Sequence, residues 1–71
     1  MNRVVVIGMG KSGVGAYRFL LERQFSPVAL EENRQVALTL QKEGFILGSG
    51  HEIDSAEFVV VSPGISPDHK W

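Results

Sequence analysis

Residues 4–13 read VVVIGMGKSG, four β-branched residues followed by a turn with three glycines. An apolar run of this kind is typical of a strand that is buried on both faces of a parallel sheet. The glycines at 8, 10 and 13 match the pattern G-x-G-x-x-G directly after that strand, where a helix is expected to open at Lys11 or Ser12. The stretch therefore predicts the strand, glycine turn and helix that begin a nucleotide-binding α/β sheet.

Each glycine of this turn has its own expected role. Gly8 makes the tight turn, Gly10 lets a phosphate approach the backbone without meeting a Cβ, and Gly13 brings the helix close to the sheet. The helix N-terminus then offers unpaired N–H groups and a positive dipole end to an anion. The glycines would also suit a purely structural packing of strand against helix. Residues 10–12 resemble the end of a P-loop, but the glycine required five positions before Gly10 is Val5, so this is not a Walker A motif.

The rest of the chain alternates strand and helix patterns. The expected elements are a helix at 12–24, a strand at 28–30, a helix from residue 34, and strands at 45–47 and 58–61. Asn33 is the expected N-cap of the second helix, and Gly44 its terminator. Right-handed crossovers then predict a Rossmann-like α/β fold whose parallel sheet has strand order 3-2-1-4, is flanked by helices and is incomplete at its C-terminal end.

Composition excludes several classes of function. A chain of 71 residues with 44% hydrophobic side chains suits one small folded domain. Seven basic and eight acidic residues give a net charge of -1 with no run of one sign, which argues against a nucleic-acid partner. The apolar run at 4–7 is too short for a membrane span, and no signal peptide is apparent, so a cytoplasmic location is expected. With no cysteine and two isolated histidines, no metal site is expected.

An acid is expected after the second strand of a dinucleotide-binding domain, about 20 residues beyond the glycines, where it meets the ribose hydroxyls. Glu31 or Glu32 stands in that place. An NAD(P)-binding domain of an oxidoreductase, or of a nucleotide-sensing regulator, is therefore an alternative function. Two glutamates after a strand would equally suit a solvated turn, and a scaffold that binds nothing is a third alternative.

The second motif is Ser62-Pro63-Gly64 within VVVSPGISP, residues 59–67. On its own it is a strand terminator, with the fixed φ of proline and a glycine free to take positive φ. Together with GMGKSG at 8–13 it resembles the N-terminal domain of the Mur ligases, most closely the D-glutamate-adding branch, over essentially all of the chain. The resemblance implies a Rossmann-like domain that holds the UDP part of UDP-N-acetylmuramoyl-L-alanine within an ATP-dependent amide ligase of peptidoglycan synthesis.

The resemblance also implies roles for individual residues. Lys11 and Ser12 match positions near the diphosphate, beside the glycines at 8, 10 and 13. The loop Glu31, Glu32 and Asn33 matches the one that borders the uracil, and Ser62, Pro63 and Gly64 match the turn that closes the other side of the uridine. The family often has aspartate where Glu31 stands and an apolar residue where Lys11 stands.

Catalysis in this family relies on a central domain with a P-loop and magnesium ligands, and the sequence has no such motif. No catalytic residue is therefore assigned to these 71 residues, and ATP and Mg²⁺ are expected only in the full-length enzyme. Residues 1–71 are expected to be a fragment of the N-terminal domain. Because the strand at 58–61 would then be an open edge, self-association of the fragment is also expected.

Overall fold

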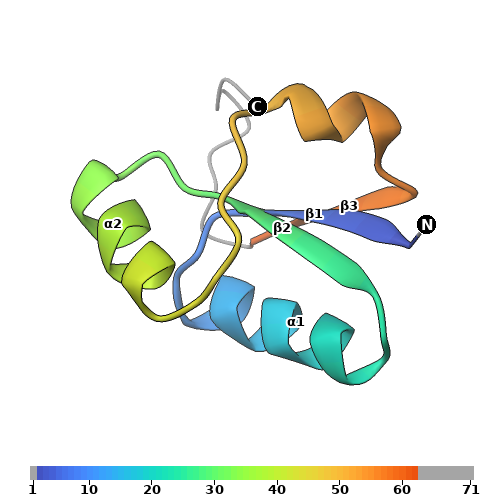
Figure 1. Ribbon diagram of the computed structural model, residues 1–71, viewed down its shortest axis with the longest axis horizontal. Coiled ribbons are helices and arrows are strands. Elements are labelled where there is room, and N and C mark those ends of the chain that lie inside the picture. Colours follow the sequence, from blue (N-terminus) through green and yellow to red (C-terminus); the bar gives the residue numbers. More distant parts are fainter. Residues whose placement is uncertain (1, 63–71) are drawn as a thin grey trace.

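A parallel three-stranded sheet forms the centre of the molecule, in a computed structural model that describes residues 2–62 (Figure 1). The elements in chain order are β1 (Arg3–Ile7), α1 (Lys11–Glu22), β2 (Ser26–Leu30), α2 (Arg34–Lys42), the 3₁₀ helix η1 (His51–Ser55) and β3 (Phe58–Val61). The strands lie in the order β2-β1-β3. The α/β class and the strand, turn and helix predicted from residues 4–13 are confirmed. Neither α-helix in the described range is long and apolar enough to cross a membrane.

The central strand β1 is buried on both faces. Val5 pairs with Val28 of β2 on one side and with Val59 of β3 on the other. Val4, Val5 and Val6 are completely inaccessible to solvent. This is the burial expected of a continuous β-branched run in a parallel sheet, where alternate side chains point to opposite faces and both faces are covered.

Two separate clusters of apolar side chains cover the two faces. On the face of α1 and α2, Tyr17, Leu20 and Leu40 pack with Phe45 against alternate residues of β1. The rings of Tyr17 and Phe45 lie with their centroids 4.7 Å apart, and the Tyr17 hydroxyl accepts the Ile46 N–H at 2.9 Å. The opposite face is covered by η1, which lies across the sheet from α1 in Figure 1.

Both α-helices end in the same hydrogen-bonded motif. After α1, the N–H groups of Gln24 and Phe25 donate to the carbonyls of Leu21 and Leu20, and Gln24 takes a φ of 68°. Gly44 ends α2 in the same way with a φ of 97°. These are Schellman caps, with a left-handed residue directly after the helix cap. The terminator predicted at Gly44 is confirmed, whereas α1 ends at Glu22, before the expected Gln24, because Gln24 takes the left-handed position.

The third strand expected at 45–47 is not formed as a strand. Leu47 makes one isolated parallel bridge with Ala29, through Ala29 N–H to the Ile46 carbonyl and Gly48 N–H to the Ala29 carbonyl, both at 2.8 Å. The segment lies on the outer side of β2, where the order 3-2-1-4 requires it, but that four-stranded order is not confirmed. Only three residues separate the helix-ending Gly44 from Gly48, which packs so closely on Val28 that a Cβ would come within 2.6 Å of it.

The helix η1 was not expected from the sequence. It follows Gly50, which has a φ of 114°, and it is held by a glutamate of its own first turn. The carboxylate oxygen Oε1 of Glu52 accepts the N–H groups of Ser49 and Gly50, both at 3.1 Å. The hydrogen bond from the backbone N–H of Glu52 itself, followed by those from Gly50 and Ser49, lowers the pKa of the Glu52 carboxyl.

Candidate nucleotide-binding site

The carboxyl ends of all three strands lie at one edge of the sheet. Gly8, Glu31 and Ser62 directly follow β1, β2 and β3. The Gly8 N–H donates to the Leu30 carbonyl and the Ser62 N–H donates to the Ile7 carbonyl, both at 2.9 Å. The hydrogen-bond ladders of β1 with β2 and of β1 with β3 therefore each continue one step past the strands. As a result, the glycine turn starts between Glu31 and Ser62. In parallel α/β sheets this edge is where ligands bind.

Gly8 and Gly13 together shape the glycine turn. Gly8 has a φ of 86°, in the left-handed region that a residue with a Cβ rarely adopts. A Cβ on Gly13 would collide with the carbonyl oxygen of Gly8 and lie 2.9 Å from its carbonyl carbon. Both glycines are therefore required by the backbone, as the pattern of the turn predicts.

Gly10 differs from its two neighbours. It is the N-cap of α1, with an extended backbone at a φ of -76° and a ψ of -164°, and a Cβ built on it would meet nothing within 4 Å. Neither the backbone conformation nor packing within residues 2–62 thus requires glycine here. Gly10 is exposed among the described residues, so a ligand can reach the backbone there.

The first turn of α1 has no side-chain cap. The first helical hydrogen bond is donated by the Val14 N–H to the Gly10 carbonyl, at 2.9 Å. The N–H groups of the residues between them therefore have no acceptor inside the helix. Lys11 and Ser12 are exposed beside these groups. An N-terminus of this kind attracts anions through its N–H groups and the helix dipole, and the Lys11 ammonium adds a positive charge.

The Glu31 side chain accepts two backbone hydrogen bonds at this edge. Its oxygen Oε1 accepts the Met9 N–H at 2.8 Å, and its oxygen Oε2 accepts the Asn33 N–H at 2.9 Å. Asn33 is the N-cap of α2, as predicted, and its Oδ1 accepts the Val36 N–H at 3.1 Å. Sequence reasoning assigned residues 31–33 to a ligand and missed these links, since no local pattern reveals a hydrogen bond between residues 9 and 31.

The structure describes only one residue of the Ser-Pro-Gly turn. Ser62 is half-buried at the end of β3, beside the glycine turn. Pro63 and Gly64 lie outside the described residues. Across residues 2–62, no group of three or more histidine, aspartate or glutamate side chains could hold a metal ion.

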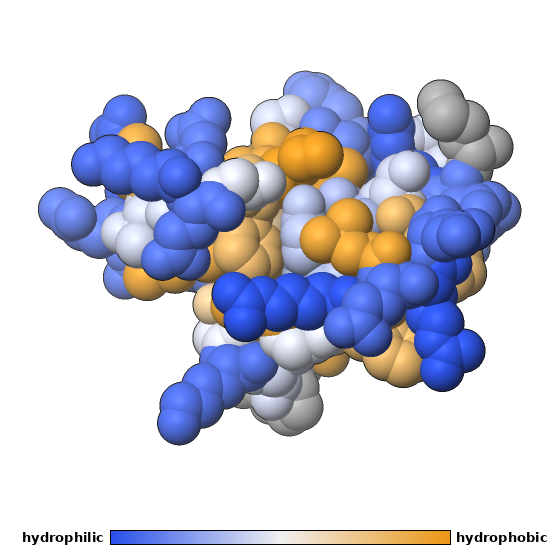
Figure 2. All heavy atoms as spheres, turned by 60° about the horizontal axis from the view of Figure 1, so that its bottom comes forward, coloured by the Kyte–Doolittle hydropathy of each residue, from blue (hydrophilic) through white to orange (hydrophobic). Residues whose placement is uncertain are grey.

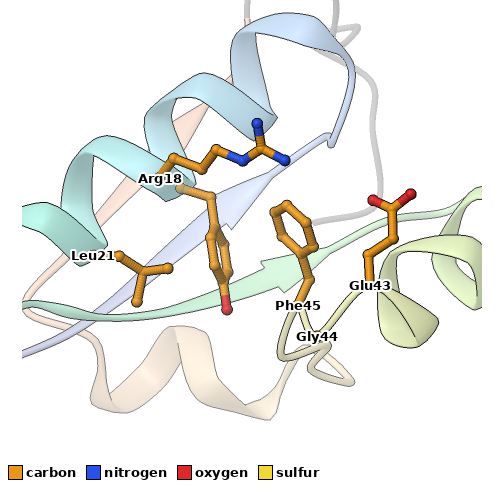
Figure 3. Close-up of a pocket in the computed structure, with 6 residues that line it drawn as sticks. Arg18, Leu21, Glu43, Gly44 and Phe45 are labelled. Carbon is orange, nitrogen blue, oxygen red and sulfur yellow. The ribbon is translucent and has the colours of Figure 1, made fainter.

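A hollow lies away from this edge, between the later half of α1 and the loop after α2 (Figure 3). Its volume is about 190 Å³, and the Arg18 guanidinium lies 5.7 Å from the centre of the Phe45 ring on its wall. The face that carries α1 shows apolar patches among charged side chains (Figure 2). None of the residues predicted to bind nucleotide lines this hollow, so it is separate from the edge of the sheet.

Comparison with known proteins identifies the family. Residues 2–71 match the Mur ligase MurD-like, N-terminal domain family. The chain is 44% identical over 73 residues to the UDP-N-acetylmuramoylalanine--D-glutamate ligase of Rubrobacter xylanophilus, which covers 94% of the chain and 16% of that relative. It is 37% identical over 75 residues to the enzyme of the same name from Chlamydia muridarum, which covers 100% of the chain and 17% of that relative.

A third relative is the UDP-N-acetylmuramoylalanine--D-glutamate ligase of Synechococcus sp. strain CC9605, at 34% identity over 83 residues, or 97% of the chain and 18% of the relative. The chain thus spans less than a fifth of the length of these curated proteins. No solved structure matches it significantly. Since the family match extends over nearly every residue, the chain belongs to the MurD-like N-terminal domain family of the Mur ligases.

Proposed function

We propose that this chain is the UDP-binding N-terminal domain of an ATP-dependent ligase that joins D-glutamate to UDP-N-acetylmuramoyl-L-alanine. The proposal rests first on Gly10, which lies at the start of α1, where no side chain caps the helix. Neither its backbone conformation nor packing within residues 2–62 requires a glycine there. A phosphate that approaches the backbone at this point supplies the missing reason for glycine. The names of the three relatives support UDP-N-acetylmuramoyl-L-alanine as the ligand.

The residues at the sheet edge divide between the two parts of UDP. The diphosphate lies against Gly8, Gly10 and Gly13, with the N–H groups at the start of α1 as donors and the side chains of Lys11 and Ser12 beside it. The uridine lies between two loops, Glu31 to Asn33 on one side and Ser62-Pro63-Gly64 on the other. Glu31 and Ser62, the first residues of the two loops, follow β2 and β3, which flank β1 on opposite sides.

The chemistry of the whole enzyme belongs to parts of the protein other than this domain. A ligase of this class transfers the γ-phosphoryl group of ATP to a carboxylate, and the amine of D-glutamate then displaces phosphate from the acyl phosphate. ATP and Mg²⁺ bind outside residues 1–71 in this proposal, and no residue of the chain is catalytic. The domain holds a water-soluble nucleotide precursor of peptidoglycan in the cytoplasm.

Titration of the ¹⁵N-labelled chain with UDP, followed by backbone amide NMR, tests the proposal. UDP is expected to shift the amides of Gly10, Lys11 and Ser12 and those of the loop at 31–33. NAD in a parallel titration tests the NAD(P)-binding alternative, which the position of Glu31 after β2 favours. Equal or larger shifts with NAD at the same amides would replace the ligase assignment with that alternative. Absence of shifts with either nucleotide would favour the third alternative, a scaffold that binds nothing.

A further inference from the structure

We infer that Glu31 is a positioning residue: its carboxylate fixes the glycine turn against the loop that starts α2, and thereby sets the distance between the diphosphate and uridine parts of the site. The inference rests on the proposed function for its ligand, but the hydrogen bonds that carry it belong to the chain alone.

The first bond holds the glycine turn directly after β1. The Gly8 N–H still donates to the Leu30 carbonyl, and Gly8 then turns the chain with a φ of 86°. Met9 is 3% exposed, and its N–H donates to the Oε1 atom of Glu31 at 2.8 Å. Without it, the Met9 N–H would be a buried donor with no acceptor, which is costly.

The second bond reaches the start of α2. The Oε2 atom of Glu31 accepts the Asn33 N–H, and the Asn33 side chain in turn caps the helix at Val36. One carboxylate therefore links the turn after β1 to the first turn of α2. Hydrogen bonds to an ionised acceptor are about twice as strong as neutral ones, so the link is well suited to hold both loops.

The link matters for binding because the two oxygens of one carboxylate hold two different loops, the glycine turn and the loop that starts α2. The glycine turn is the proposed diphosphate site, and residues 31–33 border the proposed uridine site. Holding both before the ligand arrives reduces the ordering cost of binding. The length of the side chain matters for this link: aspartate is one methylene shorter and is expected to lose one of the two hydrogen bonds, while glutamine presents an NH₂ group to one of the donors.

Glu31→Gln in the ¹⁵N-labelled chain tests the inference, with Glu22→Gln as the matched control, an exposed glutamate at the end of α1. In Glu31→Gln the amides of Met9 and Asn33 are expected to shift and to exchange faster with solvent. Affinity for UDP is expected to fall about tenfold from the loss of one charged hydrogen bond. Thermal unfolding of both variants, compared with wild type, separates loss of positioning from loss of fold, and Glu22→Gln is expected to match wild type throughout.

Glu31→Asp separates the effect of side-chain length from the effect of the negative charge. It keeps the negative charge and one of the two hydrogen bonds, so its affinity for UDP is expected between those of wild type and Glu31→Gln. Wild-type affinity in folded Glu31→Gln, or tighter binding, would overturn the inference. Fast exchange of both the Met9 and the Asn33 amide in the wild-type chain would also overturn it, and needs no variant to fold. Failure of wild type to bind UDP would instead refute the proposed function, while the exchange measurement would still decide whether the link exists.

Discussion

Gly13 of α1 packs directly on Gly8 at the end of β1, so closely that a Cβ on Gly13 would overlap the Gly8 carbonyl oxygen. This contact sets where α1 starts relative to the sheet. Gly8 and Gly13 are thus required for packing, whereas a Cβ on Gly10 would meet no described atom within 4 Å.

Gly13→Ala is expected to destabilise the chain by about 3 kcal/mol, because the added methyl group must push the helix away from backbone atoms that cannot yield. Gly15→Ala is the matched control. It lies in the same helix with nothing within 4 Å of its Cβ, and it is expected to gain about 1 kcal/mol from helix propensity. Urea denaturation of both variants measures the difference. Equal stability of the two variants would show that the contact between Gly8 and Gly13 relaxes easily.

Gly10→Val is expected to keep the fold and lose the nucleotide. The extended backbone at Gly10 accepts a β-branched residue, and a Cβ there would meet no described atom within 4 Å. Valine is a poorer N-cap than glycine, so a loss of about 1 kcal/mol is expected, small enough for the fold to survive. The same side chain would block a phosphate from the start of α1. Titration with UDP measures the loss, which in a full-length ligase appears as a raised KM for the UDP substrate. A folded variant with unchanged affinity would remove Gly10 from the site.

Glu52 is expected to make part of the stability of the chain sensitive to acid. Its folded pKa lies below the ordinary value of 4.5, chiefly because of the hydrogen bond from its own backbone N–H, with Gly50, Ser49 and the charge of His51 acting in the same direction. The unfolded chain therefore takes up the proton first as the pH falls. The stabilisation is present above 4.5 and is lost as the pH falls through the lowered folded pKa.

Unfolding of wild type and Glu52→Gln, measured in urea between pH 3 and pH 7, checks this expectation. The two stability curves should converge at the acid end, since protonated glutamate and glutamine both lack the charge. A difference that stays constant over the whole range would contradict a role for the ionised carboxylate.

The edge strand β3 is expected to promote self-association of the chain. β1 lies on one side of β3, and no strand within residues 2–62 lies on the other. Phe58 and Val61 are 43% and 55% exposed. Unpaired N–H and C=O groups beside apolar side chains favour pairing with a second copy, whereas a charge on an edge strand opposes it. Val61→Lys is therefore expected to reduce association.

Light scattering over a series of protein concentrations measures the association. Ile46→Lys is the control, because Ile46 is 60% exposed but lies next to β2, at the other side of the sheet. It should associate like wild type. A wild-type chain that remains a monomer at every concentration would contradict the expectation.

Local patterns in the sequence were sufficient for the elements that position the site. The β-branched run at 4–7 and the spacing of the glycines predicted β1, the turn and α1, because burial and turn geometry act over a few neighbouring residues. Asn33 as N-cap and Gly44 as terminator were predicted for the same reason, since caps are local hydrogen-bond motifs. β1, the central strand of the sheet within residues 2–62, could therefore be predicted before any tertiary contact was known.

The segment at 45–47 is one that local sequence patterns did not predict correctly. Its residues have strand character, but a strand also needs a ladder. The ladder with β2 is limited to two hydrogen bonds of Ala29, one with the Ile46 carbonyl and one with the Gly48 N–H. The helix η1 likewise depends on Glu52 reaching back to Ser49 and Gly50. Neither outcome follows from hydrophobic periodicity.

The sequence by itself therefore determined the order and kind of the main elements and the family, since these depend on local spacing and on motifs at 8–13 and 62–64. Only the tertiary structure decided the surroundings of Gly10 and the hydrogen-bond partners of Glu31. Whether a Cβ at Gly10 meets another atom depends on every element packed around it, and Glu31 reaches Met9 across 22 positions of the chain. Parallel strands place residues that are far apart in sequence at one edge, so the contacts that define the site exist only once the sheet has formed.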